Sequence, residues 1–249
     1  MVAFEALQVQ FTNTSMQNAA YEVTQHLNLY DSPALQSLAT QAQAGRQLRF
    51  KGLETSDAAA AFPVILCEDD YPGWITRSDL AFLQPATSAY RPSRVSLEEV
   101  KARIPLAIAF AQAAMIQPNF YLWGGTVAPN YDCSGLVQHA FSTHGIWLPR
   151  DAYQQEAFLQ RVENRGNRPE DLVETLELGD LIFFGTPVKA THVALYLGDG
   201  AYIHSSGKDQ GRNGIGMDSL TDHRETVSRN YYAQVRGAGR VVSGYQSRC

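Results

Sequence analysis

The 249-residue sequence has few cysteines, no long apolar run and no dominant charge. Its three cysteines, Cys67, Cys133 and Cys249, form no C-x-x-C pair, so we expect reduced thiols rather than a disulfide framework or a zinc ribbon. The longest apolar run, residues 104–116, is shorter than the roughly 20 residues of a membrane-spanning helix. With 20 basic against 25 acidic residues, the chain lacks the positive charge that nucleic acid attracts. Residues 1–16 contain no positively charged leader, and we therefore expect a cytoplasmic protein.

The first third of the sequence consists of short strand-like segments separated by turn residues. Three of them, residues 21–30, 45–52 and 62–76, are bounded by Gly, Pro, Asp or Ser, with no long amphipathic helix between them. A small β-barrel is the simplest fold for this part. A Pro-containing polar stretch then indicates a linker. The expected division is a barrel at residues 1–86, a linker at 87–95 and a second domain at 96–249.

The second domain alternates helix and strand signals. Ser96 and Glu99 form a capping-box pattern before a helical run that ends near Pro118. A second helix begins at Cys133 and is closed by Gly145. We therefore expect an α+β domain with helices packed on an antiparallel sheet, its strands at residues 180–185, 191–198, 201–206 and 231–242.

Cys133 lies at the start of its helix, on the same face as Leu136 and Val137. The unpaired N–H groups and the dipole at a helix start favour thiolate over thiol, so we expect an activated nucleophile. A buried structural cysteine is the commoner role for such a residue. The neighbouring chemistry must decide between the two.

Two of the six histidines, His192 and His204, flank the turn sequence LGDG and can face the Cys133 helix. If a three-residue loop is centred on Gly198, the two histidines lie directly opposite each other, whereas a two-residue loop displaces them slightly. One imidazole could then take the thiol proton while the other orients it. Zinc ligation by Cys133 and the histidines is the alternative, but the spacings match no structural zinc pattern.

Five segments in this order resemble the NlpC/P60 cysteine peptidases, which have a papain-like fold and cut bacterial cell-wall peptides. They are YLWGG (121–125), DCSGLVQHAF (132–141), GIWLPRDAYQQ (145–155), LELGDLIFF (176–184) and THVALYLGDGAYIHSS (191–206), and the resemblance covers about residues 96 to 242. The nearest resemblance is to cyanobacterial γ-D-glutamyl-L-diamino acid endopeptidases, which carry an N-terminal bacterial SH3-like barrel. LNLYDSP, GRQLRFKG and EDDYPGWI are similar to that barrel.

The resemblance implies roles for individual residues. Cys133 would be the nucleophile, His192 the general base and acid, and His204 the orienting third member. Tyr121 would lie near the thiol and help to hold the oxyanion. Asp132 and Ser134 would line the subsite for γ-D-glutamate, although Asp132 could equally serve as a helix cap, and both roles can hold together.

An acidic cluster in the first domain, Glu68, Asp69 and Asp70, precedes Tyr71. Carboxylates beside an aromatic ring would attract a free α-ammonium group, such as that of an N-terminal L-Ala. A solvated loop is the alternative interpretation. With the resemblance, Glu68, Asp69 and Tyr71 become candidate substrate-binding residues.

These inferences together predict a cysteine endopeptidase of cell-wall recycling. It would hydrolyse the bond between γ-D-glutamate and meso-diaminopimelate in murein peptides with a free N-terminal L-Ala, without a cofactor or a metal. One alternative is an N-acetylmuramoyl-L-alanine amidase of the related CHAP type, with similar Cys and His residues. The other is a non-catalytic protein that binds cell-wall peptides.

Overall fold

The computed structural model describes residues 19–52, 60–166 and 168–248. Cys249 and the sequence before Ala19 lie outside the described residues. The chain divides into two compact units, one of Met1–Pro92 with Gln246–Cys249 and one of Ser93–Tyr245. No helix in the described segments is long and apolar enough to cross a lipid bilayer.

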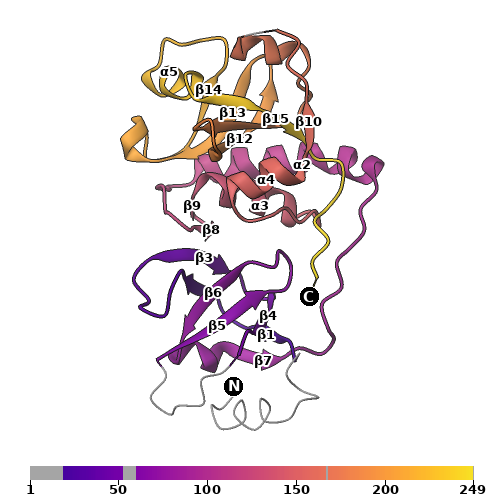
Figure 1. Ribbon diagram of the computed structural model, residues 1–249, viewed down its shortest axis with the longest axis vertical. Helices are drawn as coiled ribbons and strands as arrows, with labels where there is room; N and C mark the ends of the chain where they lie inside the picture. The colour runs from indigo at the N-terminus through magenta and orange to yellow at the C-terminus, as the bar shows by residue number, and fades with distance from the viewer. Residues whose placement is uncertain (1–18, 53–59, 167, 249) are drawn as a thin grey trace. The chain divides into compact units, whose positions relative to one another are not determined.

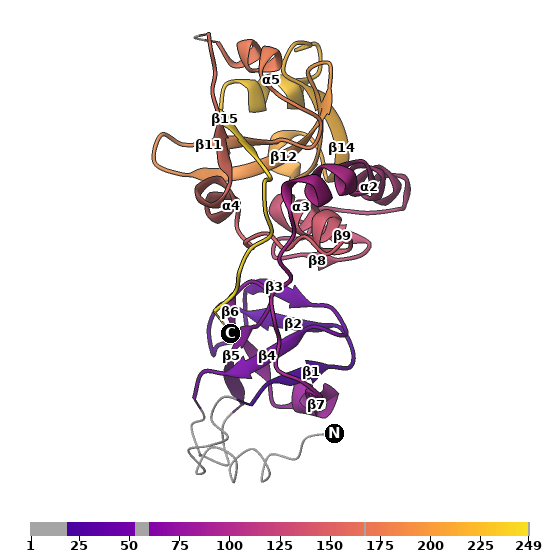
Figure 2. The ribbon, with the colours of Figure 1, turned by 90° about the vertical axis from the view of Figure 1, so that its right-hand side faces the viewer.

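The first unit is an antiparallel sheet of short strands, as Figures 1 and 2 show. In β5 every second side chain is buried, so one face of the strand supplies the core and the other faces outward. The core includes Leu29, Leu48, Val64 and Ile75. The predicted SH3-like β-structure is confirmed, with two strands, β3 and β7, that were not predicted. The sheet order is β3-β2-β6-β5-β4-β1-β7, with β1 Tyr21–Val23, β2 Leu27–Tyr30, β3 Leu38–Ala42, β4 Gln47–Phe50, β5 Ala61–Leu66, β6 Pro72–Thr76 and β7 Leu83–Pro85.

The second unit is an antiparallel six-stranded sheet with helices on both faces. Its sheet order is β10-β15-β11-β12-β13-β14, with β10 Gln160–Val162, β11 Leu181–Gly185, β12 Ala190–Gly198, β13 Ala201–Ser206, β14 Gly214–Ser219 and β15 Val235–Arg240. In Figure 1, α2 (Leu97–Ile116), α3 (Cys133–Ser142) and α4 (Ala152–Phe158) lie on one side of the sheet and α5 (Thr226–Tyr232) on the other. The predicted α+β class is confirmed.

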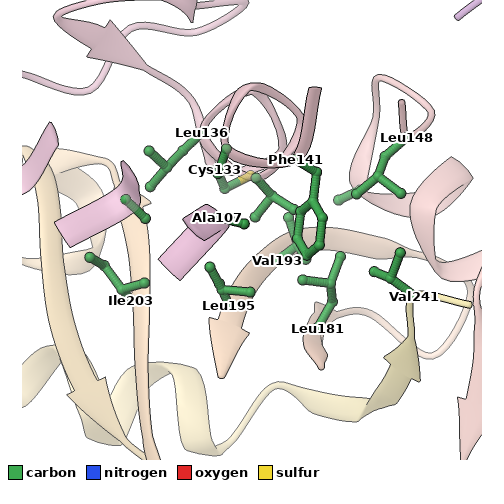
Figure 3. Close-up of a cluster of buried hydrophobic side chains, with 14 of the residues drawn as sticks. Ala107, Cys133, Leu136, Phe141, Leu148, Leu181, Val193, Leu195, Ile203 and Val241 are labelled. Atoms are coloured by element: carbon green, nitrogen blue, oxygen red, sulfur yellow. The ribbon is translucent and has the colours of Figure 1, made fainter. Parts of the chain in front are cut away.

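Alternation along β12 separates the two sides of this sheet. Val193 and Leu195 belong to the core that α3 covers, and Figure 3 shows them together with Cys133. Ala194 and Tyr196 belong to a second core, which also contains Tyr231 of α5. A strand buried on both faces reads as an almost continuous apolar run, and VALYL does so.

The caps of the first two helices follow from the sequence. The Ser96 side chain accepts a hydrogen bond from the Glu99 N–H, and the Glu99 carboxylate accepts one from the Ser96 N–H at 2.9 Å. The predicted capping box is therefore confirmed. The helix continues through Pro105. At α3, Asp132 is the cap, because its Oδ1 accepts from the Gly135 N–H at 2.7 Å.

The β12–β13 hairpin turns through Asp199 and Gly200, which both have positive φ. Asp-Gly is a favoured pair for such a tight turn. The register pairs Leu195 with Ile203, so His204 lies one step further along and His192 is its diagonal neighbour rather than its direct partner. The expected loop centred on Gly198 is therefore wrong, and the two-residue alternative holds.

The segment predicted as a strand at residues 231–242 begins as a helix. Tyr231 and Tyr232 end α5, and β15 starts only at Val235. The aromatic pair resembled strand sequence, but Tyr231 is buried against the far face of the sheet as part of a helix. Strand β14 was not predicted, because its two glycines weaken the strand pattern.

Candidate active site

Cys133 is buried at the start of α3, with 5% of its surface exposed. Its sulfur accepts hydrogen bonds from the backbone N–H groups of Val193 and Ser134. Burial, followed by the negative charge of Asp132, nevertheless raises the pKa of the thiol to about 12. The expectation of a thiolate is therefore wrong, because removal from water outweighs the N–H groups at the helix start.

His192 and His204 are bonded to each other on the opposite face of β12 from Leu195. The distance from His192 Nε2 to His204 Nδ1 is 2.7 Å, and both side chains are buried. Burial lowers the pKa of each imidazole, and for His192 the neighbouring His204 lowers it further. Both rings are therefore neutral near pH 7. The Cys133 sulfur accepts a hydrogen bond from the N–H of Val193, which is the residue that follows His192 in β12.

Asp218, on β14, extends this pair into a chain of three and was not predicted. Its Oδ2 lies 2.8 Å from His204 Nε2 and 2.7 Å from an Arg212 guanidinium nitrogen. Its Oδ1 accepts from the Ser228 hydroxyl at 2.9 Å. Burial alone would raise the pKa of Asp218, but the bonds from His204 and Ser228 and the charge of Arg212 bring it below its usual value. Asp218 is thus a buried carboxylate.

An ionised Asp218 fixes the proton positions along the chain. A carboxylate only accepts, so His204 Nε2 must carry the proton, and the neutral ring then has a lone pair on Nδ1. His192 Nε2 therefore donates to His204 Nδ1, which leaves the lone pair of His192 on Nδ1. That nitrogen is the one directed toward the Tyr231 hydroxyl, at 3.5 Å. The arrangement presents His192 Nδ1 as a base.

A negative charge on the Cys133 sulfur would raise the pKa of two tyrosines, Tyr121 and Tyr231. Burial and then the charge of an ionised Cys133 raise the pKa of Tyr121, which is half-buried. Tyr231 has a raised pKa from burial, to which Cys133 also contributes, and its hydroxyl lies 2.8 Å from Ser206 Oγ. The structure thus brings Tyr121 into the neighbourhood of the thiol. Its role at an oxyanion stays a prediction.

Asp132 forms a buried ion pair with Arg150, which also donates a hydrogen bond to Ser134. The Arg150 guanidinium donates to Asp132 Oδ1 at 3.1 Å, to Asp132 Oδ2 at 2.6 Å and to Ser134 Oγ at 3.0 Å. Asp132 also accepts from the Gly124 N–H at 2.9 Å. The capping role of Asp132 is confirmed, and contact of either residue with γ-D-glutamate stays a prediction. Arg150, with 1% exposure, was not recognised from the sequence.

Glu68 and Asp69 of the first unit are buried and paired with Arg46. Arg46 donates to Glu68 Oε2 at 3.0 Å and to Asp69 Oδ1 at 2.9 Å, and Glu68 also accepts from the Gln47 N–H. Glu68 and Asp69 are 4% and 6% exposed, so the solvated-loop interpretation is wrong for both. Tyr71 is half-buried and donates its N–H to Asp69. Recognition of an ammonium group by these residues stays a prediction.

Two family models match parts of this chain. Residues 119–237 match the NlpC/P60 family, and residues 29–80 match the bacterial dipeptidyl-peptidase SH3 domain. All three residues His192, His204 and Asp218, and also Cys133, lie inside the first match.

Two curated relatives match in part. The bifunctional muramidase/DL-endopeptidase CwlT of Bacillus subtilis is 28% identical over 139 residues, which are 54% of this chain and 40% of that protein. The γ-D-glutamyl-L-lysine dipeptidyl-peptidase of Bacillus cereus is 39% identical over 88 residues, 34% of this chain and 24% of that protein. The matches thus span less than half of either relative's length.

Among solved structures, an NlpC/P60 family protein from Bacillus cereus is 23% identical, with a TM-score of 0.45 over 94% of this chain and 66% of that one. The match at residues 29–80 lies within the first unit, and the match at residues 119–237 lies within the second. Residues 29–80 of the chain thus match a bacterial SH3 domain, and residues 119–237 match an NlpC/P60 domain.

Proposed function

We propose that the protein is a cysteine endopeptidase that hydrolyses the γ-D-glutamyl–meso-diaminopimelate bond of murein peptides. The observation that carries the proposal is the hydrogen-bonded chain His192–His204–Asp218, together with a buried thiol whose sulfur accepts a hydrogen bond from Val193, the residue after His192. The Bacillus cereus relative, named for a γ-D-glutamyl-L-lysine bond, supports the γ-D-glutamyl part. The role in recycling and the cytoplasmic location stay predictions from the sequence.

The first half of the reaction moves one proton and forms one bond. The Cys133 thiol gives its proton to His192 Nδ1 as its sulfur attacks the γ-carbonyl carbon of D-glutamate. The carbonyl oxygen becomes an oxyanion, which in this proposal accepts hydrogen bonds from the N–H of Cys133 and the Tyr121 hydroxyl. The imidazolium of His192 is stabilised through His204 by the Asp218 charge.

The second half releases both products. The C–N bond breaks, His192 Nδ1 gives its proton to the leaving amine, and a γ-glutamyl thioester remains on Cys133. A water then gives a proton to the same nitrogen and attacks the thioester carbonyl. The C–S bond breaks, the thiol regains its proton, and L-Ala-γ-D-Glu leaves.

In the free protein the Cys133 thiol and the His192 imidazole are both uncharged, and this determines when the proton moves between them. A thiol with a pKa of about 12 and an imidazole with a lowered pKa do not form an ion pair in the free protein. Proton transfer and attack on the carbonyl therefore occur together, when the substrate supplies a carbon for the developing charge on sulfur. The protein then holds its nucleophile uncharged between turnovers.

The deciding experiment is digestion of L-Ala-γ-D-Glu-meso-diaminopimelate by the parent and by Cys133→Ala. We expect the parent to release free diaminopimelate, identified by mass spectrometry, and the variant to release none. Cys67→Ala removes the other described thiol and should retain activity. A Cys133→Ala variant that cuts at the parent's rate would remove this residue from the mechanism.

The same assay separates the alternatives. An amidase of the CHAP type would instead expose a new amino terminus on L-Ala when given N-acetylmuramoyl-L-Ala peptides. A non-catalytic binding protein would leave every peptide intact while retaining it in an equilibrium binding measurement. A tripeptide with an acetylated L-Ala tests the predicted need for a free N-terminal amine, because acetylation removes its charge.

A further inference from the structure

The second unit has a pocket beside Tyr121 that the chemical steps above do not use. It is an open hollow with a volume of about 610 Å³, which lies within the ~300–1,000 Å³ that small-molecule sites occupy. It is lined by Phe120 and Tyr121, by the segment Gly207, Lys208 and Asp209, and by Asn213.

Two opposite charges line this pocket without neutralising each other. Lys208 and Asp209 are both exposed, and neither forms an ion pair within the described part of the chain. Asp209 Oδ2 accepts one hydrogen bond, from Gln210 at 3.0 Å, which leaves much of its accepting capacity free. The pocket therefore offers one anion and one cation to a ligand.

Gly207 keeps the space between Tyr121 and Asp209 open. A Cβ added at Gly207 would lie 2.5 Å from Asp209 Oδ1 and 3.8 Å from a ring carbon of Tyr121. Any larger residue would have to displace the Asp209 carboxylate. The absence of a side chain at this position thus leaves room for the Asp209 carboxylate in its present position.

The pocket adjoins the reacting groups on two sides. Tyr121 lines the pocket, and a negative charge on the Cys133 sulfur would raise the pKa of its hydroxyl. Asp209 acts electrostatically on Tyr231, whose ring stacks on His192. Asp132 and Ser134 are predicted to contact the acyl half of the substrate, and on that prediction the pocket is the space for the leaving half.

We propose that this pocket binds the leaving diamino acid, and that Lys208 and Asp209 select a side chain ending in both a carboxylate and an ammonium group. The inference rests on the proposed function and deepens it. The side chain of meso-diaminopimelate ends in a second amino acid centre, whereas that of lysine ends in an ammonium alone. Asp209 can pair with either ammonium. Lys208 finds a partner only in diaminopimelate and repels lysine.

The test compares kcat/KM for two tripeptides, L-Ala-γ-D-Glu-meso-diaminopimelate and L-Ala-γ-D-Glu-L-Lys. We expect Lys208→Gln to lower the value for the first by roughly tenfold, the worth of one charged hydrogen bond, and to leave or raise the value for the second. Asp209→Asn should lower both. Lys101→Gln on α2 and Asp199→Asn at the hairpin turn remove the same charges elsewhere and should change neither.

Each other outcome overturns the inference. An equal loss for both tripeptides in Lys208→Gln means that Lys208 contacts a group common to both, and the selectivity is overturned. If both pocket variants behave like their controls, the pocket is not a subsite. If the variants weaken inhibition by L-Ala-γ-D-Glu rather than by free diaminopimelate, the pocket holds the acyl half. A parent that cuts neither tripeptide refutes the proposed function, which the other outcomes leave intact.

Discussion

The ring of Tyr231 stacks on the imidazole of His192, with their centroids 4.3 Å apart and their planes at 25°. Tyr231 belongs to α5 and His192 to β12, so the contact joins a helix on the far side of the sheet to the proposed base. The Tyr231 hydroxyl is held by Ser206 Oγ at 2.8 Å. The stack excludes water from one face of His192 and fixes its rotation.

Replacing the Tyr231 ring should affect the chemical step. We expect Tyr231→Leu to lower kcat by about 10²-fold, with a smaller change in KM, because a loosened imidazole is misplaced for proton transfer. Water entering beside His192 should also raise its lowered pKa. The base must be unprotonated, so the acid limb of kcat/KM should move to higher pH in steady-state assays.

Two further variants isolate the ring from the hydroxyl. Tyr231→Phe retains the stack and should keep the parent's acid limb. Tyr232→Phe, next in the chain, loses only its contact with Glu170 and should behave like the parent. An unchanged pH profile in Tyr231→Leu would show that the stack does not control His192.

Asp218→Asn should disrupt the proton order along the histidine chain. An asparagine NH₂ can donate to His204 Nε2, which moves the His204 proton to Nδ1 and the His192 proton to Nδ1. His192 Nδ1 then has no lone pair to accept the thiol proton, and we expect kcat to fall on the order of 10⁴-fold, as for triads with a misplaced tautomer.

The tautomer can be observed directly by ¹⁵N NMR of the histidine rings. Asp222→Asn is a matched control, because Asp222 pairs with the exposed Arg224. Activity of Asp218→Asn within twofold of the parent would mean that Asp218 does not set the tautomer.

The neutral resting thiol predicts a specific pH dependence of alkylation. With the pKa of Cys133 raised to about 12, we expect the rate of its reaction with iodoacetamide to be low at pH 6 and to rise continuously above pH 8. Mass spectrometry of the peptide that contains Cys133 measures the rate in a Cys67→Ala background. A plateau between pH 5 and 8 would instead reveal a thiolate–imidazolium pair at rest.

Stability should decrease in mild acid because His192 and His204 are buried without a proton. Their pKa values are lowered in the folded state, whereas in the unfolded chain they titrate near 6.5. The stabilising effect is therefore complete above about pH 6.5 and is lost as the pH falls toward the folded values. Urea unfolding at pH 7.5 and pH 5.0 should show the loss, with a shallower slope in His192→Asn. A free energy of unfolding that is constant over this range would contradict the burial of neutral rings.

Removing Arg150 should destabilise the second unit strongly. Arg150→Met leaves the buried Asp132 carboxylate without its partner, and we expect a loss of about 3–5 kcal/mol in the free energy of unfolding. Arg168→Met removes an exposed pair with Asp171, which water already screens, and should cost far less. Urea titrations of the two variants measure the contrast. Equal losses would show that the burial of Asp132 and Arg150 has no energetic consequence.

Short sequence patterns predicted the helices and the hairpin that support the site. The residues that these patterns did not predict depend on contacts between distant parts of the chain. The helix starts at Ser96 and Asp132 depend on neighbouring residues and could be read from the sequence. The pairing of His192 with His204 followed from one hairpin, although the Asp-Gly turn set a different register from the expected one. A closer reading of Asp199-Gly200 as a tight-turn pair would have given the correct register.

Asp218 and Arg150 had no comparable local signal. Asp218 reaches His204 only because β14 pairs with β13, and the glycines of β14 conceal that strand. The thiol pKa was misjudged because the helix terminus is a local property, whereas burial under the sheet is a tertiary one. The catalytic roles of Cys133, His192 and His204 stay predictions for the variants above.

A buried, hydrogen-bonded sulfur also has consequences for oxidative damage. Peroxides attack thiolates, and their reaction with a protonated, shielded thiol is slow. The free protein should therefore tolerate oxidants that destroy peptidases whose cysteine is ionised at rest. Irreversible oxidation to the sulfonic acid would then threaten the enzyme mainly during turnover, when Cys133 gives up its proton.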